Sequence, residues 1–74
     1  MIIVMGILVA EVGKRIKFYR QKLEVSQEEF AEIVGMNKNY LGNIELGKQS
    51  PTIFLVEKII NALNISAEEF FTGL

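Results

Sequence analysis

Hydrophobic residues recur three and four positions apart through most of this chain, the spacing that collects side chains on one face of a helix. A first stripe lies in residues 11–23, and a later stripe lies in residues 53–63. No alternating strand pattern interrupts them, so helices are expected throughout this part of the chain. The stripe residues are Val12, Ile16, Tyr19 and Leu23, and then Ile53, Val56, Ile59, Ile60 and Leu63.

Two short helices joined by a tight turn are expected in the middle of the chain, in the segment SQEEFAEIVGMNKNYLGNIE. Ser26, with Glu29 three residues later, forms a capping box, which predicts a helix over residues 27–34. Gly35 is expected to end this helix in the left-handed conformation that glycine adopts without strain. Asn37 is then expected to cap the second helix.

Further caps complete the expected fold. The second helix of the pair should end near Leu46, Thr52 precedes the later apolar stripe, and a serine begins a last short helix over residues 66–71. Five helices with short connections predict an all-α protein, a compact five-helix orthogonal bundle that contains a helix-turn-helix. This domain is expected to occupy residues 11–74.

Residues 1–10, MIIVMGILVA, form an apolar N-terminal arm. Ten residues are too few to span a bilayer, and no positively charged segment precedes them as in a signal peptide. The arm could extend the first helix, or it could form a short strand, which the β-branched Ile2, Ile3 and Val4 favour. A strand would pair with the same strand of a second subunit, whereas an arm without one would fold over its own domain.

The residue inventory excludes most catalytic and metal-binding chemistry. The 74 residues include no cysteine, histidine, aspartate or tryptophan, and all nine acidic residues are glutamates. A histidine-based triad, a Cys/His metal site and a disulfide are therefore excluded. We expect no enzyme, no cofactor and no bound metal.

The charge is low overall but unevenly distributed. A formal net charge of −1 argues against a uniformly basic nucleic-acid binder. Lys38 and Lys48 nevertheless flank the helix that follows Asn37, and five basic residues concentrate in the first predicted helix. This sidedness permits phosphate contact on one face. The five are Lys14, Arg15, Lys17, Arg20 and Lys22.

A series of motifs runs from residue 12 to about residue 71. They are Val12-Gly13-x-x-Ile16, Arg20, Ser26-Gln27-Glu28-Glu29-Phe30-Ala31, Gly35, Ile44-Glu45-x-Gly47 and Ser50-Pro51-Thr52. In order and spacing they resemble the lambda-repressor-like, Cro/CI-type helix-turn-helix domains of the XRE family. The run Asn39-Tyr40-Leu41-Gly42 is similar to the recognition helices of restriction–modification controller proteins and of SinR-like regulators.

Polar residues make up the expected outer face of the recognition helix. Leu41 and Ile44 lie one turn apart and would anchor this helix, and a rotation of about 100° per residue then turns Asn39, Gly42 and Asn43 outward. Asparagine can form two hydrogen bonds to adenine, and lysine can reach the acceptors of guanine. The resemblance places these positions in the major groove of double-stranded DNA. The candidate base-reading residues are Lys38, Asn39 and Asn43.

The resemblance also implies contacts with DNA in addition to the hydrogen bonds to base edges. Gln27 would hold a phosphate and brace the recognition helix, at a helix N-terminus that itself attracts phosphate. Asn37 and Lys48 are further phosphate candidates. Tyr40 would contact a phosphate or a thymine methyl group, or else pack its ring against the preceding helix.

Three other positions concern the support of the recognition helix and the affinity for DNA. The resemblance implies that Arg20 and Glu45 form an ion pair between the first helix and the recognition helix. Leu46 stands where the family usually has a polar or basic residue, so one phosphate contact is expected to be missing. We therefore expect modest affinity for each subunit.

Some large hydrophobic residues do not fit the inward faces, which predicts a second apolar surface. With the N-terminal arm, this surface would join two copies in a homodimer, or the arm would cover it within one subunit. A dimer would place two recognition helices about 34 Å apart on a palindromic operator. The residues are Phe18, Phe54, Phe71 and Leu74.

The resemblance thus implies a cytoplasmic, sequence-specific transcriptional regulator, either a repressor that blocks polymerase or an activator that touches it. Its expected partners are double-stranded DNA and a second copy of itself, with no membrane and no small-molecule ligand. The alternative is a protein-interaction module of the same fold, such as an antitoxin or antirepressor.

Overall fold

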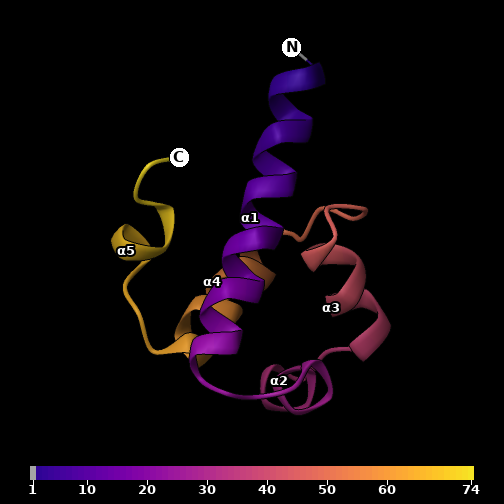
Figure 1. Cartoon of the computed structure of the whole chain (residues 1–74), viewed down its shortest axis with the longest axis vertical. Coiled ribbons are helices and arrows are strands. Elements are labelled where there is room, and N and C mark those ends of the chain that lie inside the picture. Colours follow the sequence, from indigo (N-terminus) through magenta and orange to yellow (C-terminus); the bar gives the residue numbers. More distant parts are fainter. Residues whose placement is uncertain (1) are drawn as a thin grey trace.

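Five helices make up the described part of the chain. The computed structural model describes the main chain of residues 2–74 and the side chains of residues 6–74 (Figure 1). No strand occurs in residues 2–74, so the predicted five-helix, all-α fold is confirmed. The helices are α1 (Ile2–Lys22), α2 (Gln27–Val34), α3 (Lys38–Glu45), α4 (Ile53–Leu63) and α5 (Ala67–Phe71).

Helix α1 is longer than the hydrophobic pattern predicted. It begins at Ile2 and continues through the apolar arm, so the strand expected within residues 1–10 is wrong for residues 2–10. Residue 1 lies outside the described residues. A lone strand needs a partner for its main-chain groups, whereas a helix satisfies them internally. Leu23, expected on the apolar face, follows the last residue of α1 and is 46% exposed.

Hydrogen bonds at the helix ends explain why the boundaries of α2 to α5 could be predicted from the sequence. The Ser26 hydroxyl accepts the Glu29 N–H at 3.0 Å, and the Glu29 carboxylate accepts the Ser26 N–H at 2.9 Å. The bond from the Ser26 N–H to the carboxylate, and after it the Ser26 hydroxyl group beside the carboxylate, lower the pKa of the Glu29 carboxyl below its usual value. Gly35 ends α2 with φ 83°, in the left-handed region. The other predicted caps, Asn37, Thr52 and Ser66, accept N–H groups of α3, α4 and α5.

The core lies where α1, α2, α3 and α4 meet, and one aromatic residue of α5 closes it. Phe30, Leu41 and Ile59 are fully buried, and Phe70 reaches the core from α5. Ala31 is 2% exposed on α2 and belongs to the same core cluster. Residues 2–74 include no helix that has both the length and the apolar character required to span a membrane.

Helix α1 passes through the middle of the molecule, with α3 and α5 on opposite sides of it (Figure 1). Its crossing with α3 is very close at Gly13. A Cβ atom at this position would collide with the Ile44 carbonyl oxygen and lie 3.1 Å from that of Glu45. Glycine is therefore required at this crossing, because only its lack of a side chain lets the two main chains approach.

Helix α5 is tied to α1 by one guanidinium group. Arg15 donates from Nη1 to the Phe70 carbonyl at 3.0 Å and also to the Thr72 carbonyl. These carbonyls lie at the C-terminal end of α5, where the helix dipole favours a positive charge. Arg15 therefore fixes the end of the chain against α1.

Candidate nucleic-acid interface

Helix α3 has a buried apolar face and an outward polar face. Leu41 and Ile44 are both fully buried and fasten the helix to the core. Asn39 is exposed and Asn43 is half-buried, and a rotation of about 100° per residue puts both on the side opposite that anchor. The side-chain amides at these two positions can donate and accept hydrogen bonds toward a partner outside the molecule.

The flank of α3 beside this face is in contact with α2. A Cβ atom on Gly42 would lie 3.6 Å from Gln27 Oε1, so Gly42 lies against the Gln27 side chain. The sequence predicted that Gly42 faces outward with the two asparagines. In the structure Gly42 is half-buried beside the Gln27 side chain, at a distance where a Cβ atom would make an ordinary van der Waals contact.

Three side chains link α1, α2 and α3 beneath this flank. Arg20 donates from Nε to Glu45 Oε2 at 2.7 Å and from Nη2 to Oε1 at 3.1 Å. Gln27 donates from Nε2 to Glu45 Oε1 at 2.8 Å. Arg20 is 7% exposed and Glu45 is 6% exposed, so little water screens the ion pair. The expected Arg20–Glu45 pair is present, and Gln27 braces α3 through the same carboxylate.

The start of α3 carries three of the candidate residues. The Asn37 side chain accepts the N–H groups of Asn39 and Tyr40 at 2.7 and 3.2 Å, so its oxygen serves as the helix cap. Lys38 is exposed beside it. Tyr40 is half-buried and packs against the core.

The loop after α3 returns toward the outward face. Asn43 donates from Nδ2 to Gln49 Oε1 at 3.4 Å, which connects α3 to the loop. Lys48 is exposed in the same loop, and its main-chain N–H bonds to the Asn43 carbonyl at 2.8 Å. Leu46 is 67% exposed. It presents an apolar side chain to solvent at the position where the sequence analysis expected one phosphate contact to be lost.

The seven candidate residues therefore separate into distinct parts of one surface. Asn39 and Asn43 share the outward face of α3, whereas Gln27 lies at the junction of α2 and α3. The sequence did not indicate that Gln27 and Glu45 are bonded, because the two residues are 18 positions apart and no local pattern connects them. The remaining candidates are Asn37, Lys38, Tyr40 and Lys48.

Comparisons with known proteins agree with this geometry. A family model described as helix-turn-helix, HTH_3, matches residues 16–70. The solved structure of the restriction–modification controller protein C.AhdI from Aeromonas hydrophila matches with a TM-score of 0.83 and 27% identity. That match covers 89% of this chain and 96% of the controller protein.

Curated regulators of transcription are similar in sequence. Bacillus subtilis YazB, described as an uncharacterized HTH-type transcriptional regulator, is 37% identical over 57 residues, which are 77% of this chain and 83% of YazB. The HTH-type transcriptional regulator SinR of Bacillus subtilis is 41% identical over 56 residues, or 74% of this chain, and the match spans only 50% of SinR. With the family model matching more than half of its length, this chain belongs to the HTH_3 family of XRE-type helix-turn-helix transcriptional regulators.

Proposed function

We propose that this protein is a sequence-specific regulator of transcription that binds a palindromic operator in the cytoplasm as a homodimer. In this proposal α3 of each copy enters the major groove of double-stranded DNA. Asn39 and Asn43 then face the base edges, while Gln27, Asn37 and Lys48 lie near the phosphate backbone. Tyr40 packs on the core and contacts DNA only from the flank of α3.

One observation carries this proposal, namely the outward placement of Asn39 and Asn43 opposite the fully buried Leu41 and Ile44. A short helix with outward side-chain amides fits the width of the major groove, and asparagine can form paired hydrogen bonds to adenine. Asn43 would give up its 3.4 Å hydrogen bond to Gln49 for such a contact. The core holds this helix rigidly, which favours recognition because little conformational freedom is lost on binding.

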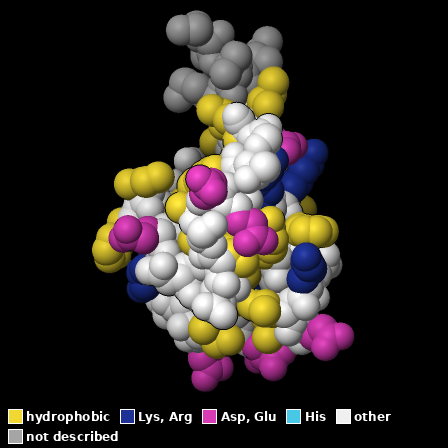
Figure 2. Space-filling model, turned by 90° about the vertical axis from the view of Figure 1, so that its left-hand side faces the viewer, with side chains coloured by type: hydrophobic (Ala, Val, Ile, Leu, Met, Phe, Trp, Pro, Cys, Tyr) yellow, Lys and Arg dark blue, Asp and Glu magenta, His cyan; other side chains and the backbone are white. Residues whose placement is uncertain are grey.

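The opposite side of the molecule is unsuited to DNA. The face that carries α5 shows acidic side chains among hydrophobic ones, with basic side chains mainly toward its edges (Figure 2). Glu68 and Glu69 are exposed on α5. Their charges would repel phosphate. DNA is therefore expected to approach from the side of α3.

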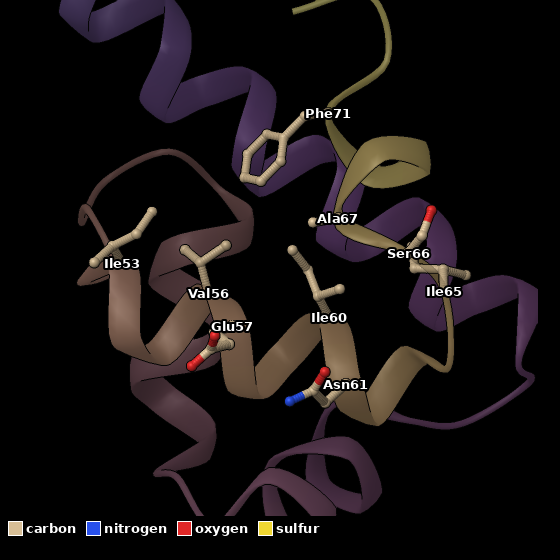
Figure 3. Close-up of a pocket in the computed structure, with 9 residues that line it drawn as sticks. All are labelled: Ile53, Val56, Glu57, Ile60, Asn61, Ile65, Ser66, Ala67 and Phe71. Carbon is tan, nitrogen blue, oxygen red and sulfur yellow. The ribbon is translucent and has the colours of Figure 1, made fainter.

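The apolar surface for dimerisation lies between α4 and α5. Phe71 of α5 faces Val56 and Ile60 of α4 across a groove (Figure 3). Ile53, which lines the groove, is 79% exposed, and the next residue of α4, Phe54, is 67% exposed. Large exposed hydrophobic residues that gather beside a groove are typical of a protein interface. Because Phe54 is exposed, the extension of α1 does not cover it, which favours the second copy as its partner.

The proposed homodimer predicts that one variant has a lower molecular mass in solution than the wild type. Replacing both Ile53 and Phe54 by serine should leave the fold intact, because both are exposed, and should convert a two-chain species to a single chain. Sedimentation equilibrium at tens of micromolar measures the mass. Ile33→Ser is the matched control, since Ile33 is 62% exposed on α2, away from this surface. A wild-type protein that stays a single chain would contradict the homodimer.

The DNA proposal predicts loss of specific binding when either outward amide is removed. We expect Asn39→Ala and Asn43→Ala to cost about 1–3 kcal/mol each for the preferred duplex and to relax the preference at one base pair. The preferred duplex comes from selection on a random library, and fluorescence titration measures the affinities. Gln21→Ala, which removes an exposed amide from α1, is the control and should bind as the wild type does.

The same titration separates the regulator from the alternative. Specific binding that weakens steeply with added salt supports the regulator. A wild-type protein without affinity for any duplex at low salt would favour the alternative function, an antitoxin or antirepressor whose apolar surface binds another protein.

A further inference from the structure

The outer face of α1 carries two exposed hydrophobic residues that the core does not use. Ile7 and Phe18 are each 55% exposed. Three helical turns separate them, so their side chains point in nearly the same direction and lie about 16 Å apart along the helix axis. Phe18 follows the fully buried Ile16 by two residues, a rotation of about 200°, which puts this face opposite the core.

Two opposite charges lie between these hydrophobic residues. Glu11 and Lys14 share the same face, and Lys14 Nζ lies 3.6 Å from Glu11 Oε2. The Lys14 side chain is 71% exposed and that of Glu11 is 37% exposed, so water screens this pair and both groups remain accessible to a further contact. The order along the outer face is therefore apolar, acidic, basic and apolar.

This order is complementary to itself when it is reversed. Two copies of α1, placed antiparallel about a two-fold axis between residues 12 and 13, bring Ile7 opposite Phe18 of the second copy and Glu11 opposite its Lys14. The same contacts recur on the other side of the axis, as two-fold symmetry requires. Successive positions of the face are separated by four, three and four residues, which is the spacing of a seam between two packed helices.

The surroundings leave this face accessible. The first turns of α1 project beyond the other helices (Figure 1). The Phe18 ring meets the Tyr19 ring edge-on at 5.2 Å between centroids, and Lys22 Nζ lies 5.3 Å from the Phe18 centroid. Both of these neighbours belong to α1 itself. Neither Ile7 nor Phe18 lines the groove between α4 and α5, so the outer face of α1 is a separate surface.

We infer that the outer face of α1 is a second self-association surface, on which two copies pack antiparallel with Ile7 on Phe18 and Glu11 on Lys14. The contact goes beyond the proposed α4–α5 dimer and does not depend on DNA. Four hydrophobic side chains and two ion pairs bury less than the roughly 1,200 Å² of a stable interface, so the contact is weak and transient. The variant with serine at positions 53 and 54 therefore remains mainly a single chain at tens of micromolar.

Disulfide trapping detects such a transient contact, and the chain has no cysteine of its own. Ile7→Cys and Phe18→Cys, each added to the variant with serine at positions 53 and 54, are mixed and oxidised, and mass spectrometry separates the mixed disulfide from the two symmetric ones. We expect the mixed disulfide to form roughly tenfold faster than either symmetric one, because antiparallel packing brings positions 7 and 18 together and holds equal positions about 16 Å apart. Ile33→Cys, mixed with Phe18→Cys, is the matched control, since Ile33 is 62% exposed on α2.

Charge reversal supplies an independent test of the antiparallel register. Glu11→Lys in both cysteine variants places like charges opposite each other and should slow the mixed disulfide about fivefold. Glu11→Lys on the Ile7→Cys chain, combined with Lys14→Glu on the Phe18→Cys chain, places opposite charges together again and should restore the rate. The Ile33→Cys pair with the same charge changes measures any general attraction between the chains.

The inference is overturned if the mixed disulfide forms no faster than the control, if the symmetric disulfide of Ile7→Cys predominates, or if charge reversal affects both pairs equally. Neither DNA nor the α4–α5 surface takes part in these measurements, so failure here leaves the proposed function untouched. Thermal melting of each variant, followed by circular dichroism, verifies that the exposed substitutions leave the fold unchanged.

Discussion

Replacing Gly13 by alanine is expected to destabilise the protein by about 3 kcal/mol or more, because the added methyl group collides with main-chain atoms that cannot rotate away. The atoms in question are the carbonyl oxygens of Ile44 and Glu45 at the end of α3. Small domains have only about 5 kcal/mol or somewhat more in total, so the variant should be largely unfolded or should move α3 away from α1. Urea unfolding followed by circular dichroism measures the loss.

Gly6 provides a matched control in the same helix. Among the described side chains and outside the backbone of its own helix, no atom lies within 4 Å of a Cβ built on Gly6. Gly6→Ala should therefore stabilise α1 by roughly 0.5–1 kcal/mol, since alanine is the better helix former. If Gly13→Ala were as stable as Gly6→Ala, the close crossing of α1 and α3 would be refuted.

Removal of the Glu45 carboxylate is expected to have a similarly large effect. Glu45→Ala leaves the buried Arg20 charge without its partner and takes the acceptor from Gln27, a change that typically costs about 3–5 kcal/mol. Loss of the ion pair should also free the end of α3 and abolish specific DNA binding. Denaturant unfolding gives the stability, and titration with the selected duplex gives the affinity.

Two further variants show whether the unpaired Arg20 charge is the cause of the stability lost in Glu45→Ala. Glu57→Ala removes an exposed carboxylate from α4 and should change the stability by no more than about 0.5 kcal/mol. Converting both Arg20 and Glu45 to methionine removes the two charges together, so this double variant should be more stable than Glu45→Ala. A Glu45→Ala protein as stable as Glu57→Ala would show that the pair contributes little.

The ends of α2, α3, α4 and α5 could be predicted because each depends on local hydrogen bonds. Ser26, Asn37, Thr52 and Ser66 all accept main-chain N–H groups two or three residues later, which requires no knowledge of the tertiary fold. Gly35 follows the same logic, since its left-handed φ is a local property of the helix end.

Residues 2–10 could not be assigned from sequence, because β-branched side chains favour a strand only where a neighbouring strand exists.

The environment of the two sides of α3 also depends on the tertiary fold and could not be predicted from local sequence. The helical period placed Asn39, Gly42 and Asn43 together on the side away from Leu41, but only the tertiary fold shows that the Gln27 side chain of α2 lies beside Gly42. The close crossing at Gly13 likewise depends on the path of α3 and leaves no local signal.

The outward placement of Asn39 has a consequence for how such regulators diversify. In the proposed complex with DNA, substitutions at an exposed position of α3 would alter the preferred operator, whereas the melting temperature is governed by buried positions such as Leu41 and Ile44. If α3 reads DNA as proposed, gene copies of this protein would acquire new targets by exchanging one solvent-facing residue, without a compensating change in the interior.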